Sequence, residues 1–413
     1  MLEKSKIEEV FIDQFSQFKN KNSGMERMVN IKKYLATEQV VVISGIRRCG
    51  KSTLLKQFAD HLNNFYYINF DDERLINFTV DNFNDLLAVW QKNFKSTNIL
   101  IDEIQNIKSW ERFIRRIHDE GYKIFITGSN SKLLSSELST HLTGRYKKLE
   151  LYPFSFVEFI KFKNIPAQAK TTEEKAVLSK FFSEYLSRGG FPEYIKNKDT
   201  ETVKRIYEDV IYKDIIARFG IREIKSFRLL ANWLFTNFTK EASYNSLAKI
   251  LGIKTAATVS EYVSFLQEAY LLFELYKYDY SLKKQYTSNK KIYVIDNGLR
   301  NEIAFSVSED RGRLLENIVF IELKRRGQEA YFFRGKKECD FILLEKNKIK
   351  QALQVSLDFN GNNKKREMDG LLEAMIKFDL PSGVILTEDQ EEEIKISGKK
   401  IKIQPVYRWL VEN

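Results

Sequence analysis

Residues 40–58 read VVVISGIRRCGKSTLLKQF, and this stretch decides the fold of the first part of the chain. The run VVVIS is apolar and β-branched, as expected of a buried strand, whereas LLKQF has the mixed apolar and polar character of an amphipathic helix. Between them, GIRRCGKS fits the pattern GxxxxGK[ST] in the strand-to-helix context that this motif requires. The stretch therefore predicts a phosphate-binding loop, the alternative being a chance match in a turn before an ordinary helix.

The residues of this loop match the chemistry of the phosphate groups of a nucleotide. Backbone N–H groups at the start of a helix bind phosphate, because they have no partner within the helix and the helix dipole favours negative charge there. Gly45 and Gly50 permit the close approach of the backbone. Lys51 is expected to contact the β- and γ-phosphates, and the Ser52 hydroxyl is expected to bind Mg²⁺. Together with Thr53, these residues form the predicted binding set for ATP and Mg²⁺.

Polar residues end two further predicted strands. NILIDEI ends in the acids Asp102 and Glu103. Asp102 is placed to bind the magnesium shell and Glu103 to orient or deprotonate the attacking water, which distinguishes an ATP hydrolase from a passive nucleotide sensor. YKIFITGSNS ends in Ser129 and Asn130, either of which is placed to sense the γ-phosphate. The alternatives are a helix N-terminal cap for the two acids and a plain turn for Ser129 and Asn130.

Length and composition describe a globular protein of two or three domains. The chain has 413 residues, of which 43% are hydrophobic, which is enough for each domain to have its own core. Its apolar runs are shorter than the roughly 20 residues of a membrane span, and its first residues lack the apolar core of a signal peptide, so we expect a cytoplasmic protein. Two distant cysteines and three scattered histidines argue against a disulfide framework and a structural zinc site. The net charge of +11 suits an anionic partner without identifying one.

Changes in the hydrophobic pattern divide the chain into three predicted domains. Residues 1–152 alternate β-rich runs with helical patterns and are expected to form the P-loop ATPase core, an α/β fold with a parallel sheet. Residues 153–297 carry long helical segments and a winged-helix pattern. Residues 298–413 combine a helix, three strand-like runs, a second helix and a further strand in another α/β pattern.

The middle region contains a helix-turn-helix pattern. Residues 241–275 predict one helix, a turn at Gly252 and a second helix from about Lys254 to Gln267. Thr255, Thr258 and Ser260 are expected to face outward with Lys254, and short polar side chains there suit insertion in the major groove of DNA. Apolar residues at helical spacing are expected to form the core of the motif: Leu247, Ile250, Leu251, Val259, Tyr262, Val263 and Leu266.

The runs LLFELYKYDY and KIYVIDNG are expected to pair as the strands of a wing. Basic and aromatic residues lie between the strands or at their ends, namely Lys283, Lys284, Tyr286, Lys290 and Lys291. This composition favours a DNA contact. Two alternatives stay open, because winged helices also bind proteins and a lysine-rich hairpin tip is often a solvated turn.

Eight motifs along the chain resemble those of one family. They are GIRRCGKST, LIDEIQNI, ITGSNS, HLTGRYKKLELYPFSFVEF, YLSRGGFPEY, KIYVIDNGLR, RLLENIVFIEL and CDFILLE. On these motifs the chain resembles archaeal and bacterial AAA-type P-loop ATPases whose carboxy-terminal region is similar to a degenerate restriction-endonuclease-like nuclease. The resemblance implies an arginine that reaches the γ-phosphate. Arg145 of LTGRY holds the matching position, Arg188 is a second candidate, and the alternative for Arg145 is a surface arginine tied to a local carboxylate.

The carboxy-terminal region matches the metal-dependent nuclease core only in part. In that core a helix supplies a glutamate, one strand supplies an aspartate, and the next strand carries an acid and then, two residues later, a lysine. Glu316 and Asp340 fit the first two positions. Gln354 and Ser356 stand where the acid and the lysine are expected, so the site lacks one metal ligand and its cation. We therefore expect that this region does not cut DNA.

The sequence as a whole predicts an ATPase that binds MgATP and uses hydrolysis to change its conformation or its hold on DNA or a protein partner. One alternative is an ATP-regulated nuclease, in which Lys364 or Lys365 replaces the missing lysine. The other is a non-catalytic regulator that binds proteins through its winged-helix and carboxy-terminal domains. The oligomeric state stays open, and so does the question of whether Arg145 acts on the nucleotide of its own chain or of a neighbour.

Overall fold

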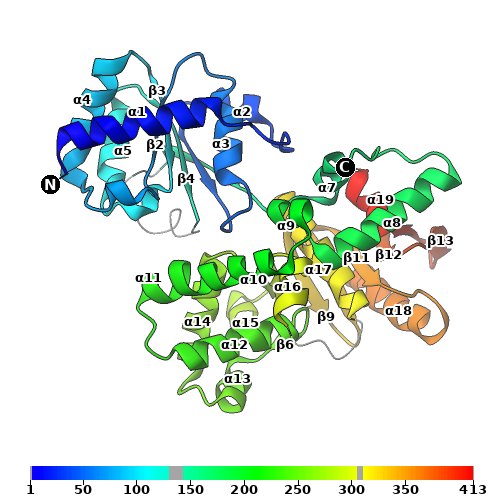
Figure 1. Ribbon diagram of the computed structural model, residues 1–413. Coiled ribbons are helices and arrows are strands. Elements are labelled where there is room, and N and C mark those ends of the chain that lie inside the picture. The colour runs from blue at the N-terminus through cyan, green and yellow to red at the C-terminus, as the bar shows by residue number, and fades with distance from the viewer. Residues whose placement is uncertain (1, 130–141, 143, 305–309, 413) are drawn as a thin grey trace. The chain divides into compact units, whose positions relative to one another are not determined.

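The chain forms two compact units, Met1–Leu151 and Tyr152–Asn413, hereafter the N-terminal unit and the C-terminal unit (Figure 1). The structure is a computed structural model that describes residues 2–129, 142, 144–304 and 310–412. Among the helices of these residues, none combines the length and the apolar character that a membrane crossing requires.

The N-terminal unit is built on a five-stranded parallel sheet with the strand order β2-β3-β4-β1-β5. The four apolar runs of the sequence form strands β1 to β4, which confirms the predicted parallel-sheet α/β fold. The fifth strand, YKKLE, lies at the sheet edge, where a polar composition is tolerated and gives little sequence signal. The strands are β1 (Val40–Ser44), β2 (Tyr66–Asn69), β3 (Asn98–Asp102), β4 (Lys123–Gly128) and β5 (Tyr146–Glu150).

Helices cover both faces of this sheet. Helices α1 (Lys4–Asn20), α4 (Phe83–Asn93) and α5 (Trp110–Asp119) share one apolar core with alternate strand residues. Helix α3 (Lys51–Ala59) packs on the other face, where the ring centroids of Phe58 and Phe125 are 5.0 Å apart. Strand residues therefore meet helices on either side, which is why the inner strands are apolar throughout. Short helical turns lie in the connections: α2 (Ile31–Leu35) and the 3₁₀ turns Glu73–Leu75, Val80–Asn82 and Ile104–Asn106.

The C-terminal unit begins with helices. Two of them start at a capping box, in which a Ser155 or Thr171 hydroxyl accepts from the N–H of a glutamate three residues later, and that glutamate accepts in return from the capping residue. The helices are α7 (Phe156–Phe162), α8 (Thr172–Arg188), α9 (Pro192–Asn197), α10 (Thr200–Asp209), α11 (Ala217–Phe219) and α12 (Ile224–Thr236), with a π-helical segment at Val210–Ile216.

A helix-turn-helix and a three-stranded antiparallel sheet follow. Helices α13 (Tyr244–Leu251) and α14 (Ala256–Glu268) meet at Gly252, whose φ of 64° lies in the left-handed region that favours glycine. The two predicted helices, their turn and the pairing of the two flanking strands are all present. The sheet has the order β6-β8-β7, with β6 (Glu241–Ala242), β7 (Leu272–Tyr276) and β8 (Lys290–Val294), and helix α15 (Leu282–Thr287) connects β7 to β8.

Two details of the helix-turn-helix differ from the prediction. Ile250 was expected in the core but is 67% exposed, because it lies on the outward side of the last turn of α13. The second helix begins at Ala256 rather than near Lys254, because Thr255 is its N-cap. The Thr255 hydroxyl accepts from the N–H of Thr258 at 3.1 Å, so this threonine has a structural role at the helix start.

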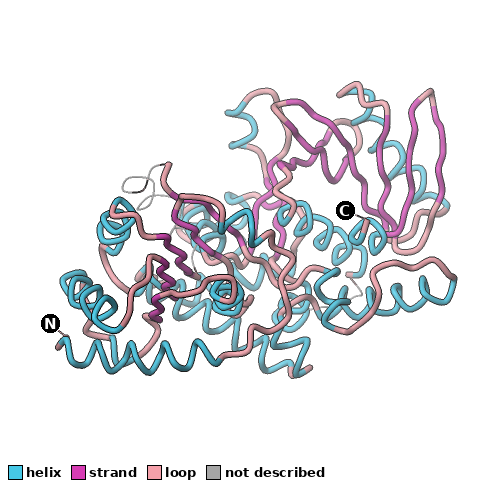
Figure 2. Tube along the Cα trace, turned by 90° about the horizontal axis from the view of Figure 1, so that it is seen from above, coloured by secondary structure: helices cyan, strands magenta, loops and turns pink. Residues whose placement is uncertain are grey.

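The rest of the C-terminal unit is a six-stranded mixed sheet with the order β13-β14-β12-β11-β10-β9, drawn in magenta in Figure 2. The predicted runs YFFR, CDFILLEK, ALQVSL and GVILTED form β9 to β12, and β13 and β14 extend the sheet. The strands are β9 (Glu329–Arg334), β10 (Glu338–Glu345), β11 (Lys348–Ser356), β12 (Ser382–Thr387), β13 (Glu392–Ile396) and β14 (Lys399–Pro405). The helices are α16 (Asn297–Ile303), α17 (Arg311–Arg325), α18 (Gly361–Lys377) and α19 (Val406–Val411).

Candidate functional site

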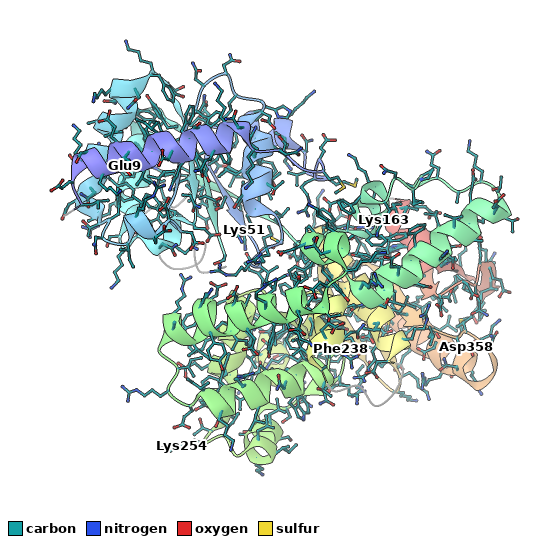
Figure 3. The ribbon with its side chains drawn as sticks, in the orientation of Figure 1. Glu9, Lys51, Lys163, Phe238, Lys254 and Asp358 are labelled. Atoms are coloured by element: carbon teal, nitrogen blue, oxygen red, sulfur yellow. The ribbon has the colours of Figure 1, made fainter. Side chains whose placement is uncertain are left out.

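The predicted phosphate-binding loop links β1 to α3 in the N-terminal unit. Gly50 is the N-cap of α3, with a φ of 104° that a residue with a Cβ rarely adopts. Lys51, labelled in Figure 3, is only 4% exposed. Its ammonium donates to the carbonyl oxygens of Gly45 at 3.1 Å and Ile46 at 3.2 Å. The lysine therefore folds back over its own loop, at the end of the helix whose dipole attracts anions.

Gly45 lies against the last residue of the N-terminal unit. A Cβ at this position would be 2.1 Å from the carbonyl oxygen of Leu151. The N–H of Leu151 donates to the carbonyl of Ser44 at 2.7 Å, and the Cys49 thiol donates to the carbonyl of Leu151 at 3.3 Å. The loop is thus closely packed against Leu151, which leaves no room for a side chain at Gly45.

Asp102 accepts hydrogen bonds from hydroxyl groups at the carboxyl edge of the sheet. It ends β3, is buried, and accepts from Ser52 of α3 and Thr127 of β4. The phenol of Tyr67, on β2, hydrogen-bonds to the same carboxylate. Burial raises the pKa of Asp102, as does the charge of Glu103, whereas the Ser52 and Thr127 hydroxyls lower it. The two predicted magnesium ligands, Ser52 and Asp102, are therefore in direct contact.

Glu103 is held beside Asp102 by neutral groups. Its φ of 54° is in the left-handed region, and its N–H donates to the Thr127 hydroxyl at 3.1 Å. The amide of Gln105 donates to the Glu103 carboxylate and lies 3.4 Å from the Ser129 hydroxyl. A non-glycine residue in this conformation is strained, and such strain is common where a side chain must be aimed at a ligand. Glu103 and Ser129 thus meet through Gln105, whereas Asn130, also a predicted site residue, lies outside the described residues.

A buried arginine lies next to the loop. Arg27, between α1 and α2, donates from its guanidinium to the carbonyl of Cys49 at 2.8 Å. Gln57 of α3 holds this segment in place, because its side chain accepts from the N–H of Arg27 at 3.2 Å and donates to the carbonyl of Met25 at 2.7 Å. The segment before the first strand therefore adds a positive charge beside the loop.

Arg145 lies at the amino-terminal ends of the parallel strands, whereas the loop lies at their carboxyl ends. Its carbonyl accepts from the N–H of Val40, the first residue of β1, at 2.9 Å, whereas the loop follows Ser44, the last residue. The two ends of this strand are roughly 13 Å apart. The Arg145 guanidinium donates to both carboxylate oxygens of Asp119, at 2.8 and 2.9 Å. Of the two possibilities left open by the sequence, this placement argues against a contact with the nucleotide of the same chain, and a contact with the nucleotide of a neighbouring chain stays a prediction.

A second cluster of charged residues lies in the C-terminal unit, where the nuclease resemblance implied a metal site. Glu316 comes from α17, and Glu338 and Asp340 come from β10. Between them lies Lys291 of β8, whose ammonium is 3.0 Å from Glu316, 2.7 Å from Glu338 and 3.1 Å from Asp340. Tyr293 of the same strand donates to Glu316 at 2.7 Å. Strand β8 thus supplies both a cation and a hydroxyl to the three acids.

The position of Lys291 differs from two expectations, one about the wing lysines and one about the missing nuclease lysine. It was expected among the wing lysines that contact DNA, but it is only 4% exposed. Lys364 and Lys365 were the candidates for a displaced nuclease lysine, but Lys364 lies 3.6 Å from Glu392 and Lys365 is exposed. Burial opposes the charge of Lys291, yet the surrounding carboxylates raise its pKa well above its ordinary value. The lysine of this cluster is therefore Lys291, supplied by a strand outside the six-stranded sheet.

The side chain at the third position of the nuclease pattern, where an acid is expected on the second strand, is neutral. Gln354 of β11 accepts from the N–H of Asp340 at 3.2 Å and donates to Glu367 of α18 at 2.5 Å. Asp340 in turn accepts from the N–H of Val355 at 3.0 Å. A pocket of about 620 Å³ opens over these residues, and its lining also includes basic side chains: Arg313, Arg334, Lys336, Lys337 and Arg366.

Two of the quoted sequence motifs, YLSRGGFPEY and KIYVIDNGLR, contact each other elsewhere in the C-terminal unit. The N–H of Gly190, in SRGG, donates to Asp296 of VIDNG at 2.6 Å, and a Cβ on Gly189 would be 2.1 Å from the same carboxylate. Burial raises the pKa of Asp296 to about 6. Arg188, the second candidate arginine, lies 3.6 Å from Glu184. Within this unit the two motifs contribute to internal packing.

Sequence comparison finds relatives along almost the whole chain. A family model described as an AAA domain matches residues 37–160, and one described as a domain of unknown function matches residues 179–310. An uncharacterized protein from Methanocaldococcus jannaschii is 38% identical over 98% of this chain and 94% of its own length. The chain belongs to the same family as that protein. A second relative, an uncharacterized protein from Haemophilus influenzae, is 31% identical over 91% of this chain and 95% of its own length.

Comparison with solved structures gives similarities of low TM-score. The Aeropyrum pernix ORC1 protein, solved in complex with DNA, is 11% identical, covers 74% of this chain and 97% of its own, and has a TM-score of 0.34. DnaA from Aquifex aeolicus, solved with AMPPCP, is 15% identical, covers 58% of this chain and 86% of its own, and has a TM-score of 0.26. Similarity at this level carries no argument about function.

Several residues near the two clusters received no role there from the sequence. Gln105 follows Glu103 by two residues in the sequence, and this spacing could have predicted a contact between their side chains. Lys291 and Tyr293 alternate with apolar residues in KIYV, and this period of two places them on one face of a strand. Arg27 and Tyr67 carry no such signal, because only the folded chain brings them to the loop and to Asp102.

Proposed function

We propose that the AAA domain of this protein binds MgATP and hydrolyses it. The observation that carries the proposal is the direct contact between Ser52, in the phosphate-binding loop, and Asp102, at the end of a neighbouring strand. Both are oxygen ligands of the kind that Mg²⁺ prefers. Glu103 follows Asp102 at the same edge of the sheet, where it suits a role in activating water.

Each residue of the site has a distinct role in this proposal. The Lys51 ammonium leaves the loop carbonyls of Gly45 and Ile46 and contacts the β- and γ-phosphates. Mg²⁺, held by Ser52 and Asp102, would neutralise charge on the phosphates. Glu103 takes a proton from the attacking water while Gln105 keeps its carboxylate in place. Ser129, which lies next to Gln105, senses the γ-phosphate.

Two substitutions separate binding from hydrolysis. We expect Lys51→Ala to abolish tight nucleotide binding, because Lys51 contacts phosphates in the ground state. Glu103→Gln should keep nucleotide binding and reduce turnover by about a hundredfold or more, because only the proton transfer is lost. Binding is measured with a fluorescent ATP analogue and turnover by phosphate release at saturating MgATP. Glu120→Gln, at an exposed glutamate of the same unit, is the matched control, and turnover at the parent rate in Glu103→Gln would refute the role of Glu103.

We propose further that the C-terminal unit contacts DNA through a winged helix. The order α12, β6, α13, α14, β7 and β8, in which the three strands form one small sheet, supports this, as do exposed lysines. Lys254, labelled in Figure 3, lies between the two helices of the motif, and Lys283 and Lys284 lie on α15. Lys290 is less available, because its ammonium donates to the carbonyl of Tyr286 at 2.8 Å.

Salt dependence tests the DNA contact. Replacing Lys283 and Lys284 by glutamine should weaken binding similarly across sequences and reduce the log–log salt slope by about 0.9 for each phosphate that the protein no longer binds. Lys290→Gln is the matched control, and no binding by the parent protein at low salt would favour a protein partner.

In the same samples with Mg²⁺ or Mn²⁺ we expect the DNA to stay uncut, because Gln354 and Ser356 replace a metal ligand and a catalytic lysine. Nicking that disappears in Asp340→Ala would contradict this.

A further inference from the structure

The charged cluster of the C-terminal unit has the composition of a metal site, with an ammonium at its centre. Glu316, Glu338 and Asp340 each place a carboxylate oxygen against one atom, Lys291 Nζ, at 3.0, 2.7 and 3.1 Å. A lysine ammonium has three N–H donors. Lys291 donates hydrogen bonds to Glu316 and Asp340 and forms an ion pair with Glu338, so its ammonium is surrounded by three carboxylates.

The three distances are those of an ammonium among carboxylates. Mg²⁺ binds oxygen ligands at about 2.0–2.1 Å, whereas hydrogen bonds from an ammonium to a carboxylate are roughly 0.7 Å longer. In the parts of the chain that the structure describes, no three His, Cys, Asp or Glu side chains are arranged to hold a metal ion. The acids are thus spaced for the lysine that they contact.

The backbone of β8 fixes the position of Lys291. The strand lies between β6 and β7 in its sheet, with Lys291 paired to Glu241 on one side and to Leu275 on the other. Asn317 of α17 holds Val294 of the same strand, accepting from its N–H and donating to its carbonyl, both at 2.9 Å. The ammonium is therefore delivered to the acids by a rigid element.

Charge balance shows what the loss of Lys291 would leave. Arg334 pairs with Glu338, at 2.6 Å, and also with Glu241, so four carboxylates face two cations. When all are ionised the excess is two negative charges, because four minus two is two. Without Lys291 the excess grows to three, and the carboxylates left without a partner are the oxygen ligands that a divalent cation prefers.

We propose that Lys291 is a built-in cation that takes the place of a divalent metal ion among Glu316, Glu338 and Asp340. In the parent protein this cluster binds no Mg²⁺ or Mn²⁺. Replacing Lys291 by a neutral residue opens the position, and the three carboxylates move inward to bind the ion. The strand that carries Lys291, β8, pairs with β6 and β7 and lies outside the six-stranded sheet that carries Glu338 and Asp340. This role of Lys291 is independent of the proposed ATP hydrolysis.

Titration of the full-length protein with Mn²⁺ in the absence of nucleotide tests the proposal, with free Mn²⁺ followed by electron paramagnetic resonance. Lys291→Ala should bind one more Mn²⁺ per chain than the parent protein, and the double variant Lys291→Ala with Asp340→Asn should return to the parent stoichiometry. Lys290→Ala, the neighbouring lysine on the same strand, is the matched control and should behave as the parent. Any ion at the phosphate-binding loop is common to all four proteins and cancels.

Two results would overturn the proposal. One is a parent protein whose Mn²⁺ stoichiometry falls on Asp340→Asn, because the metal would then bind beside Lys291. The other is a Lys291→Ala protein that is folded by circular dichroism and binds no more Mn²⁺ than the parent. Lys291→Met, which keeps most of the side-chain volume, guards against a folding defect: Mn²⁺ should raise its melting temperature but not that of the parent or of Lys290→Met. Failure of both Lys291 variants to fold even with Mn²⁺ would also contradict the proposal.

Discussion

Two lysines of this protein, Lys51 and Lys291, are equally buried but have partners of different charge. Both are 4% exposed. Lys51 donates to two carbonyls of its own loop, whereas Lys291 is surrounded by three carboxylates. A neutral carbonyl can give up an ammonium to a phosphate and be rehydrated, but a buried carboxylate that loses its cation keeps an uncompensated charge. The charge of the partners, and not burial, therefore distinguishes a lysine that is free to bind a ligand from one that is part of the fold.

The largest expected effect is on stability. Lys291→Met should lower the free energy of unfolding of the C-terminal unit by about 3–5 kcal/mol, because the buried Asp340 and the partly buried Glu316 and Glu338 lose their cation. Lys51→Met should cost the N-terminal unit only about 1 kcal/mol, because neutral hydrogen bonds are lost. Hydrogen exchange followed by mass spectrometry gives the stability of each unit separately, in nucleotide-free buffer at neutral pH. Equal losses at the two positions would remove the distinction between the lysines.

A smaller effect is expected at Gln105, which holds Glu103 by a neutral hydrogen bond. Gln105→Ala should reduce kcat roughly ten- to a hundredfold, because the carboxylate is no longer aimed, with KM and nucleotide affinity unchanged. Gln91→Ala is the matched control, since Gln91 donates to Tyr122 at 3.0 Å, away from the loop. Steady-state kinetics with a binding assay separates these quantities. A rise in KM at constant kcat would mean that Gln105 contacts the substrate and does not position Glu103.

The smallest effect is expected at Arg145, whose partner Asp119 is half exposed. Arg145→Ala should change stability by less than about 1 kcal/mol. It should leave turnover unchanged in dilute protein, because Arg145 lies at the far end of β1 from the loop. Turnover measured over a range of protein concentrations, beside Asp119→Ala, checks this. A loss that grows with concentration would support a contact with a neighbouring nucleotide, and a loss in dilute monomer would contradict the placement of Arg145.

Local sequence predicted the fold and the candidate nucleotide site where each signal lies within a few residues. The loop from Gly45 to Thr53 needs only a strand before it and a helix after it. Asp102 and Ser129 each follow an apolar run, and the carboxyl ends of parallel strands meet at one edge of a sheet. The convergence of these residues therefore follows from the direction of the strands.

The remaining features depend on how distant segments pair, which one sequence does not specify. Lys291 meets the acids only because β8 packs against α17 and β10, from 25 to 49 residues away along the chain. Arg145 lies far from the loop because the amino end of β5 pairs with the amino end of β1. Ile250 has helical spacing for the core, but the crossing of α13 and α14 leaves it outside.

The packing of Gly45 against Leu151 has a mechanical meaning. Leu151 is where the chain leaves the N-terminal unit, and its N–H and carbonyl are held by Ser44 and Cys49, on either side of that glycine. Because both backbone groups of Leu151 are hydrogen-bonded to residues beside Gly45, Leu151 cannot move independently of the loop. When the loop changes its conformation on binding a ligand, Leu151 must move with it, because Gly45 already lies as close to the Leu151 carbonyl as the backbone allows. Leu151 is therefore the residue through which a movement of the loop would reach the chain that follows the N-terminal unit.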